Sequence, residues 1–328
     1  MIDKYGRKHD YLRISLLERC NLRCTYCMPE EGIQLRDKSE FMSEEELLQI
    51  VSVFVDFGIK KIRLTGGEPL IKKNFSSILK NLSEFPVELT MTTNGILLDR
   101  YIEDLQKAGM KKLNISIDSL EENRFNAITR RKDFKRIIKN IDLAHAAGFD
   151  IKLNVVLMKN INEDEIVDFV EMTGKERMHL RFIEFMPFDG NKWDWSKKVT
   201  EQEILSKVNN HFKSEHVIAL PSPPNSTSRN FKVDSFKSTF GIISTLTNPF
   251  CDTCNRIRLT ADGKIKNCLF SNNEGDILGA LRAGKDIRSL IRQSILEKHE
   301  KRAGIKTFQT EGDAEIFKAN RSMTTIGG

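Results

Sequence analysis

Residues 20–27 read CNLRCTYC and place three cysteines in one short loop with the spacing C-x3-C-x2-C. Iron–sulfur clusters of the [4Fe–4S] type are normally held by four cysteine thiolates, so a set of three leaves one iron with a vacant coordination position. A vacant iron can bind a small molecule and pass an electron to it. We therefore expect Cys20, Cys24 and Cys27 to hold such a cluster. A structural zinc site completed by a distant fourth ligand is the alternative.

The cysteine loop follows the first of six β-type segments that alternate with amphipathic helical stretches. A capping box of Ser43 and Glu46 begins one of these helices, and Gly58 ends it. Six β/α units predict a parallel sheet with right-handed crossovers. Because no seventh and eighth units follow, we expect an α/β fold with an open, partial (β/α)6 barrel of the TIM type. The candidate strands are Tyr11–Leu16, Lys61–Thr65, Val87–Thr93, Lys111–Ile117, Asp150–Leu157 and His179–Met186.

Polar side chains recur on one face of these strands. Side chains alternate along a strand, so Asn114, Ser116 and Asp118 share one face of their segment. A closed barrel fills its interior with branched apolar side chains, and this pattern differs from that. The repeated polar face therefore predicts a wet cavity inside the barrel. The same parity groups Arg13 with Ser15, Lys61 with Arg63 and Thr65, Thr90 with Thr92 and Asn94, and Lys152 with Asn154.

Composition places limits on the class of protein. The 328 residues can form one large domain or a domain with an appendage. No stretch approaches the roughly 20 apolar residues that span a bilayer, and residues 1–11 lack the apolar segment of a signal peptide. We therefore expect a cytoplasmic protein without a membrane partner, in which the six cysteines serve metal binding or catalysis before disulfides. The net charge of +6 comes without clustered basic runs, so we expect no nucleic-acid partner.

The β/α pattern changes after Met186. Residues 187–195 read as a loop, and Thr200–Phe212 reads as one more helix. Residues 221–229 are rich in Pro, Ser and Asn and predict an exposed loop or linker. We place a domain boundary near residue 218, with the barrel in residues 1–218 and a C-terminal domain in residues 219–328.

A second cysteine triplet lies in the C-terminal part. Cys251 and Cys254 form a C-x2-C turn, and Cys268 returns across a hairpin whose turn is Ala261-Asp262-Gly263. A zinc knuckle is a fair alternative on spacing alone. All six cysteines nevertheless fall into two triplets, which two clusters with one open iron each explain most simply. The histidines that could complete a zinc site are His179, His211, His216 and His299.

The run Thr65-Gly66-Gly67-Glu68-Pro69 follows the second candidate strand directly. Glycines at the end of a strand let the backbone approach a ligand closely. Glu68 beside them can accept hydrogen bonds from an ammonium group. Many βα loops contain a Gly-Gly turn, so the turn alone is weak evidence. It follows the strand that comes after the cysteine loop, and this position favours a site for the aminoacyl end of a cofactor.

Two arginines follow the second C-x2-C turn. Arg256 and Arg258 alternate on one strand and project to the same side, where a solvated strand face is the alternative. The guanidinium fork suits phosphate or a purine edge. Together with the basic residues of the barrel face, they fit a nucleoside triphosphate held by side chains, since the chain has no Walker-type loop.

Taken together, these motifs resemble the GTP 3′,8-cyclase family of molybdenum-cofactor biosynthesis, whose members are radical S-adenosylmethionine (SAM) enzymes. The match runs in the family's order over almost the whole chain and is more specific than a general radical SAM pattern. The matching stretches are CNLRCTYCMP, RLTGGEPL, TTNG, NISID, RFIEFM, CNRIRLTADGKIKNCLF and the terminal Gly-Gly.

The resemblance implies a partial barrel closed at one side by a C-terminal domain that carries a second [4Fe–4S] cluster. It assigns the first cysteine triplet to the cluster that holds SAM and the second triplet to a cluster that faces the guanine base. Terminal glycines are usually frayed; in this family the tail enters the active site, so Gly327 and Gly328 join Arg256 and Arg258 as residues that assist catalysis. The positions matching SAM contacts are Tyr26, Gly67, Glu68, Ser116 and Met186, and those matching GTP contacts are Arg13, Arg63, Thr92, Lys152, Arg256 and Arg258.

The resemblance also implies the reaction. A lyase-type enzyme would convert GTP to (8S)-3′,8-cyclo-7,8-dihydroguanosine 5′-triphosphate, using a radical derived from SAM to activate C3′ of the ribose. A one-electron reductant and the next pathway enzyme, which forms cyclic pyranopterin monophosphate, would be its partners, and a homodimer is compatible with it. Radical SAM peptide-modifying enzymes are one alternative, but they generally carry more cysteines after the barrel. A non-catalytic electron carrier or zinc-stabilised scaffold would have no use for the polar cavity.

Overall fold

A twelve-stranded sheet runs through the whole protein in the order β12-β11-β10-β1-β2-β3-β4-β5-β6-β9-β8-β7. The computed structural model describes residues 1–34, 36–175, 178–305 and 320–327. The six candidate strands are confirmed, with ends that shift by at most two residues, and they pair in parallel with their sequence neighbours. They are β1 (Tyr11–Ser15), β2 (Lys61–Thr65), β3 (Glu88–Thr93), β4 (Lys112–Ser116), β5 (Asp150–Leu157) and β6 (His179–Glu184).

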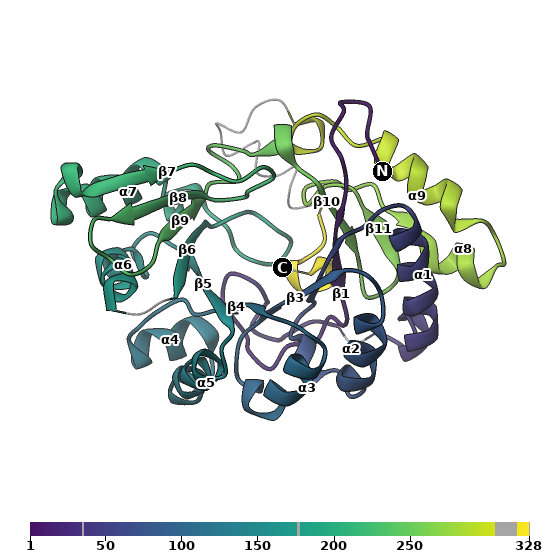
Figure 1. Cartoon of the computed structure of the whole chain (residues 1–328), viewed down its shortest axis with the longest axis horizontal. Helices are drawn as coiled ribbons and strands as arrows, with labels where there is room; N and C mark the ends of the chain where they lie inside the picture. The colour runs from purple at the N-terminus through teal and green to yellow at the C-terminus, as the bar shows by residue number, and fades with distance from the viewer. Residues whose placement is uncertain (35, 176–177, 306–319, 328) are drawn as a thin grey trace.

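Helices cover the outer side of the arc of strands (Figure 1). The side chain of Ser43 accepts a hydrogen bond from the backbone of Glu46 and so begins α1, as the capping box predicts. Gly58, with a φ of +87°, follows its end. This partial barrel confirms the expected fold class. The helices of this part are α1 (Glu44–Asp56), α2 (Phe75–Ser83), α3 (Ile102–Lys107), α4 (Glu122–Thr129), α5 (Phe134–Ala146) and α6 (Ile166–Lys175).

The register of the strands sorts side chains into an apolar and a polar face. Leu113 and Ile115 are fully buried in the main apolar core with residues of the covering helices. On the other parity, Thr92 lies opposite Asn114 and Ser116 opposite Asn154. Parallel neighbours in register bring equal parity to the same face, so the polar residues form continuous rows inside the arc.

The C-terminal part extends both edges of the barrel sheet. β9 (Phe240–Ile243) pairs in parallel with β6, and β10 (Arg256–Leu259) pairs in parallel with β1. The antiparallel pairing of β10 with β11 (Lys264–Lys266) confirms the predicted hairpin. Residue 218 lies inside β7 (Val217–Leu220), and the sheet is continuous across it, so the domain boundary stays a prediction. The remaining elements are β8 (Arg229–Val233), β12 (Gly275–Asp276), α7 (Glu201–Phe212), α8 (Ile277–Arg282), α9 (Ile287–Leu296) and α11 (Met323–Ile326).

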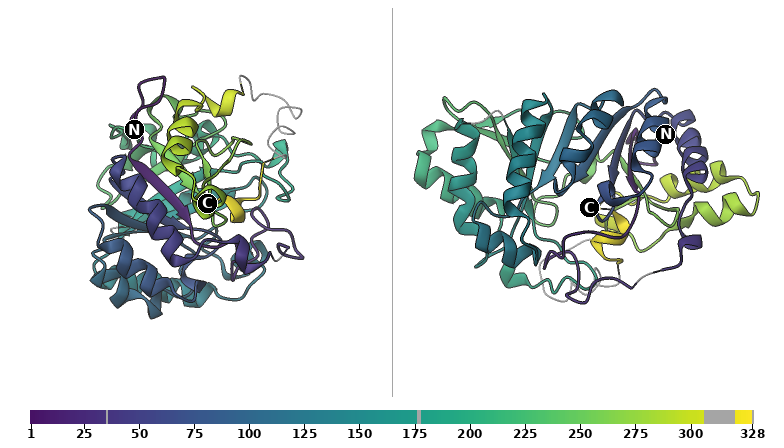
Figure 2. Two further views of the ribbon diagram at one scale, coloured as in Figure 1. Left: turned by 90° about the vertical axis from the view of Figure 1, so that its right-hand side faces the viewer. Right: turned by 90° about the horizontal axis from the view of Figure 1, so that it is seen from below.

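Two further features of the fold concern the site. The helix expected over Thr200–Phe212 is α7, and Thr200 forms its capping box with Glu203. The described end of the chain, with α11, lies inside the arc of strands in Figure 1 and in the right view of Figure 2. Within the described ranges, no helix has the length and apolar character needed to cross a membrane.

Candidate functional site

A cavity of about 340 Å³ opens where the strands of the barrel end. Both cysteine triplets line it, so the first loop and the distant second triplet face one space. Polar side chains on β3, β4 and β5 and directly after β3 and β4 form one wall of it, as the polar parity predicts. The carboxyl ends of barrel strands are where the active sites of such folds lie. The polar residues of this wall are Thr92, Asn94, Asn114, Ser116, Asp118 and Asn154.

The cysteine loop lies directly on the Gly-Gly turn after β2. The backbone N–H of Gly67 donates to the carbonyl of Leu17 at 2.8 Å, and that of Glu68 donates to the carbonyl of Arg19 at 2.9 Å. A Cβ added to Gly67 would lie 2.0 Å from the carbonyl oxygen of Arg19. Only glycine therefore permits this approach, and the turn fixes the chain that leads into Cys20.

Glu68 holds the loop after β3. Its buried carboxylate accepts hydrogen bonds from the Thr93 hydroxyl at 2.7 Å and from the backbone N–H groups of Asn94 at 2.7 Å and Leu70 at 3.0 Å. Burial raises the pKa of Glu68 to about 7. Asn94 in turn donates to the side chain of Asn21 at 2.7 Å. Glu68 thus positions the cysteine loop through Asn94, a role that the sequence did not indicate; its contact with an ammonium group stays a prediction.

Tyr26 is fixed by a carboxylate of the opposite wall. Its hydroxyl donates to Asp118 at 2.7 Å, and the other oxygen of Asp118 accepts from the backbone of Val156 at 2.9 Å. Burial raises the pKa of Asp118 to about 6. The sequence placed Asp118 on the polar face without assigning it a role. The other residues predicted to contact SAM, Gly67, Glu68, Ser116 and Met186, line the same cavity.

The thiols of the two triplets differ in their electrostatic surroundings. Burial raises the pKa of Cys20 to about 11 and that of Cys27 to about 12. Burial would also raise the pKa of Cys254, but Lys298 and Arg256 lower it to about 6. The buried ammonium of Lys298 lies 3.4 Å from the sulfur of Cys254 and donates to the carbonyl of Arg256 at 2.9 Å. Lys298 is a site residue that the sequence did not reveal.

The donor set fits a cluster better than a single ion. All six cysteines are free thiols, and among the described residues no three His, Cys, Asp or Glu side chains are placed to hold one metal ion. Zinc gathers its thiolates around one centre at about 2.3 Å, whereas the thiolates of a [4Fe–4S] cluster each bind a different iron. No described histidine lines the cavity, which also argues against a zinc site completed by histidine.

A row of guanidinium groups crosses the sheet beside the second triplet. Arg258 on β10 lies opposite Arg13 on β1, which lies opposite Arg63 on β2. Arg13, Arg256 and Arg258 line the cavity. Burial lowers the pKa of Arg13 to about 10 and that of Arg258 to about 9, as expected of clustered cations with little water. This positive wall suits a polyanionic ligand.

The structure adds one arginine to this positive wall and leaves two of the predicted basic residues outside the cavity lining. Arg181 on β6 lines the cavity and donates to Asn114 at 2.9 Å, although the sequence reading did not name it. Its register partner is Asn154 on the polar face, a pairing that the sequence alone does not give. Arg63 and Lys152 do not line the cavity. The guanidinium of Arg63 donates instead to the carbonyl of Met91 at 3.0 Å. Their contact with a nucleotide stays a prediction.

The C-terminal tail reaches the site. Gly327 has a φ of +77°, and a Cβ there would lie 2.9 Å from the side chain of Thr65 and 3.1 Å from that of Ser15. The guanidinium of Arg258 donates to the carbonyl of Gly327. The tail therefore packs on the carboxyl ends of β1 and β2 at the cavity, which the family resemblance implies that it enters. Gly328 lies outside the described residues.

Comparisons with known proteins agree with this arrangement. Residues 14–173 match the Radical SAM superfamily, and residues 178–304 match Molybdenum Cofactor Synthesis C. The chain is 43% identical to the GTP 3′,8-cyclase of Thermodesulfovibrio yellowstonii over 100% of both chains. It is 43% identical to the mitochondrial GTP 3′,8-cyclase of Arabidopsis thaliana, covering 100% of this chain and 83% of the relative.

Other relatives are longer or more distant. Molybdenum cofactor biosynthesis protein 1 of Drosophila melanogaster is 47% identical over 86% of this chain, which spans only 50% of that relative. Among solved structures, Streptococcus suis SuiB superimposes with a TM-score of 0.65 at 15% identity, covering 94% of this chain and 70% of SuiB. At that identity, the likeness to SuiB establishes the fold alone.

Proposed function

Because the chain belongs to the GTP 3′,8-cyclase family of the radical SAM superfamily, we propose that it converts GTP to (8S)-3′,8-cyclo-7,8-dihydroguanosine 5′-triphosphate. This is the first step of molybdenum cofactor biosynthesis. The observation that carries the proposal is that both cysteine triplets and four arginines, Arg13, Arg181, Arg256 and Arg258, line one cavity. A radical initiator and an anion-binding wall are thereby brought to the same ligand.

The first half of the cavity suits the cofactor. Cys20, Cys24 and Cys27 would hold a [4Fe–4S] cluster, and Gly67 and Ser116 would contact SAM beside it. When bound, the cluster and SAM supply a carbon radical that removes a hydrogen atom from the substrate. Tyr26, held by Asp118, keeps one wall of this half rigid. Such rigidity matters because radical chemistry depends on the distance between the reacting atoms.

The second half suits the nucleotide. Cys251, Cys254 and Cys268 would hold a second [4Fe–4S] cluster facing the guanine base. Arg13, Arg256 and Arg258 would bind and orient the triphosphate, because guanidinium groups donate paired hydrogen bonds to phosphate oxygens. Cyclisation would end with the transfer of one electron and a proton to the guanine base, and the positive charge of these arginines would stabilise the negative charge that develops there.

The tail and the partners complete the proposal. Gly327, and Gly328 after it, would close the cavity beside Arg258 and exclude water from the radical. Turnover would need an external one-electron reductant, and the product would pass to the enzyme that forms cyclic pyranopterin monophosphate. We place the protein in a reducing compartment, the cytoplasm, since its thiols must stay reduced to bind iron.

The test is a product analysis under strictly anaerobic conditions. The reconstituted protein is given dithionite, SAM and either GTP or ATP, and the products are identified by mass spectrometry. We expect 5′-deoxyadenosine and a cyclised triphosphate from GTP but no cyclised product from ATP, with about eight iron atoms per chain. Formation of 5′-deoxyadenosine without a cyclised GTP would overturn the cyclase assignment, and iron near about four would overturn the second cluster.

A matched pair of variants tests whether the positive wall of arginines binds the substrate. Arg256→Ala should lower cyclised GTP by about 10- to 100-fold, the usual cost of a charge-assisted hydrogen bond, while uncoupled cleavage of SAM persists. Arg288→Ala is the control, since this exposed arginine pairs with Asp56 and does not line the cavity. Equal loss of both activities in Arg256→Ala would argue against its role in binding the substrate.

A further inference from the structure

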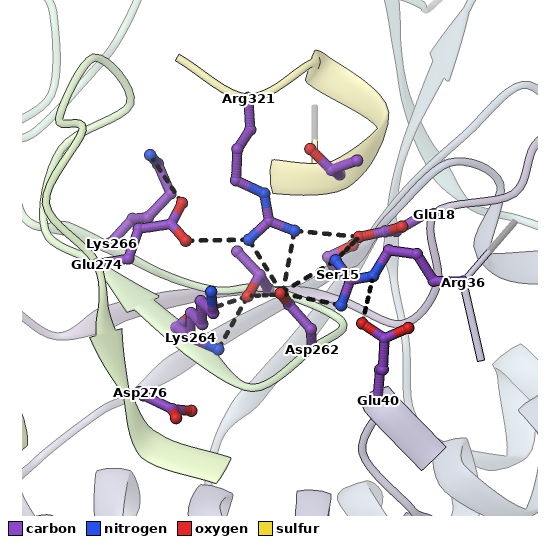
Figure 3. A network of polar contacts seen from close by, with 12 residues as sticks. Ser15, Glu18, Arg36, Glu40, Asp262, Lys264, Lys266, Glu274, Asp276 and Arg321 are labelled. Carbon is purple, nitrogen blue, oxygen red and sulfur yellow. Dashed lines mark hydrogen bonds and ion pairs between the residues drawn. The ribbon is translucent and has the colours of Figure 1, made fainter. Parts of the chain in front are cut away.

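A partly buried network of ion pairs holds Arg321 in the C-terminal tail (Figure 3). The guanidinium of Arg321 donates to Asp262 at 3.1 Å, to Glu274 at 3.0 Å and to Glu18 at 3.1 Å. Three carboxylates from three separate segments thus converge on one side chain of the tail. We call Glu18, Asp262, Glu274 and Arg321 the tail network.

A second residue of the tail is bonded as firmly. The side chain of Asn320 is buried, donates to the carbonyl of Leu269 at 2.7 Å and accepts from Lys266 at 3.0 Å. Lys266 also pairs with Glu274 at 3.1 Å. Consecutive tail residues are therefore anchored by charged or amide groups with little exposure to water, where such bonds are stronger than on the surface.

The network is attached to both cysteine loops. Glu18 precedes Cys20 by two residues, and Leu269 directly follows Cys268. Asp262 lies in the turn of the hairpin that carries Arg258. The anchors of the tail therefore belong to the same short segments that present the cysteines and the substrate-facing arginine.

Arg36 contacts two of the carboxylates that Arg321 contacts, so the effect of Arg321 on the tail can be tested without unfolding the protein. Arg36 donates to Glu18 at 3.3 Å and to Asp262 at 3.2 Å, so both buried carboxylates keep a cation when Arg321 is replaced. Removing the last partner of a buried charge is strongly destabilising, but here one partner remains. Loss of Arg321 should accordingly release the tail without unfolding its surroundings.

We propose that Arg321 is a positioning residue that, with Asn320, locks the tail onto both cysteine loops and so holds Gly327 beside Arg258. The catalytic part of this inference rests on the proposed function: a released tail would uncouple cleavage of SAM from cyclisation of GTP. The structural part, the lock itself, does not depend on the identity of the substrate.

The test compares Arg321→Gln with Arg288→Gln in the anaerobically reconstituted protein. Hydrogen exchange of the peptide covering residues 322–327 should become about tenfold faster in Arg321→Gln, with exchange of the barrel strands unchanged. Arg288→Gln should match the wild type, and Arg321→Lys should restore part of the protection. Unchanged exchange of the tail, or faster exchange spread over the whole protein, would overturn the lock.

The catalytic consequence has its own readout. The ratio of cyclised GTP to 5′-deoxyadenosine should fall in Arg321→Gln while the KM for SAM stays at the wild-type value. Glu274→Gln, which removes one carboxylate partner of Arg321, should give an intermediate ratio and is the second variant if Arg321→Gln does not fold. A released tail with an unchanged ratio would overturn the coupling role. If the wild type forms no cyclised GTP, the proposed function fails while the exchange experiment still decides the lock.

Discussion

His9 ties the N-terminal segment to the second cysteine loop through a chain of buried polar groups. Its side chain is fully buried, and its Nε2 lies 3.0 Å from Asp3, which also accepts from Arg7 at 2.7 Å. Arg7 donates in turn to the carbonyl of Cys251 at 3.0 Å. Burial and the nearby Lys298 lower the pKa of His9 to about 4. Burial would raise the pKa of Asp3, but hydrogen bonds from His9 and Arg7 lower it to about 2.

We expect the free energy of unfolding to fall as the pH drops below the ordinary pKa of histidine. The folded pKa of His9 is about 4, below the ordinary value of 6.5, so between these values the unfolded chain binds more protons. The stabilisation is complete above about pH 6.5 and is lost towards pH 4, by about 2 kcal/mol at pH 5. His9→Gln keeps a donor towards Asp3 but cannot titrate. Denaturant unfolding should therefore show a shallower pH dependence for His9→Gln.

The exposed Asn210 provides the control for this experiment. Asn210 lies on α7 and does not titrate, so Asn210→Gln should leave the pH dependence of unfolding as it is in the wild type. Parallel curves for the wild type and His9→Gln between pH 7 and pH 5 would contradict the prediction.

The sequence predicted site residues correctly where the spacing of cysteines or the alternation of side chains along a strand identifies them. The cysteines and the pair Arg256 and Arg258 belong to this group, and the structure brings them all to one cavity. Lys298 could not be found, because it lies in a charged run after α9 that reads as a solvated surface. Its burial arises only when that run packs against β10. Tertiary contacts of this kind leave no local pattern.

At the scale of elements, the turn after β2 decides where the first cysteine loop lies. A Cβ at position 67 would overlap the carbonyl of Arg19, which is backbone and cannot turn aside. We expect Gly67→Ala to displace the loop and to lower the iron content towards half of the wild type, because the second triplet is untouched. Iron analysis after anaerobic reconstitution measures this.

Gly109→Ala is the matched control for the turn. Its Cβ would enter open space, although its φ of +69° makes the substitution strained. Gly109→Ala should lower the free energy of unfolding by about 1 kcal/mol without loss of iron. Wild-type iron content in Gly67→Ala would refute the steric argument, and equal iron loss in both variants would point to general instability instead.

The elements themselves followed largely from periodicity. A side-chain period of two within each strand, combined with parallel pairing of neighbours, was enough to predict the polar wall. The pairings of β9 with β6 and of β10 with β1 could not be predicted, since these strands are far apart in the sequence. Arg181 was missed for a related reason: its place in the wall depends on the register of β6 against β5.

At the scale of the whole molecule, the barrel and the C-terminal part share one sheet. β1 is covered at its outer edge by β10, and β6 by β9, so neither edge of the six-stranded barrel is free. An uncovered edge strand offers unpaired backbone groups to other chains. The two parts therefore depend on each other for more than the completion of the cavity.

We expect a fragment of residues 1–216, which ends before β7, to be unable to fold as an independent domain. It would expose β1 and β6 as free edges together with the apolar surface that β9 and β10 cover, so it should aggregate or bind a hydrophobic dye. Co-expression with residues 217–328 should restore a soluble complex, because the missing strands return to both edges, and the intact chain should unfold in one transition. A monomeric fragment that unfolds cooperatively would contradict this dependence and would support the separable barrel domain that the sequence predicts.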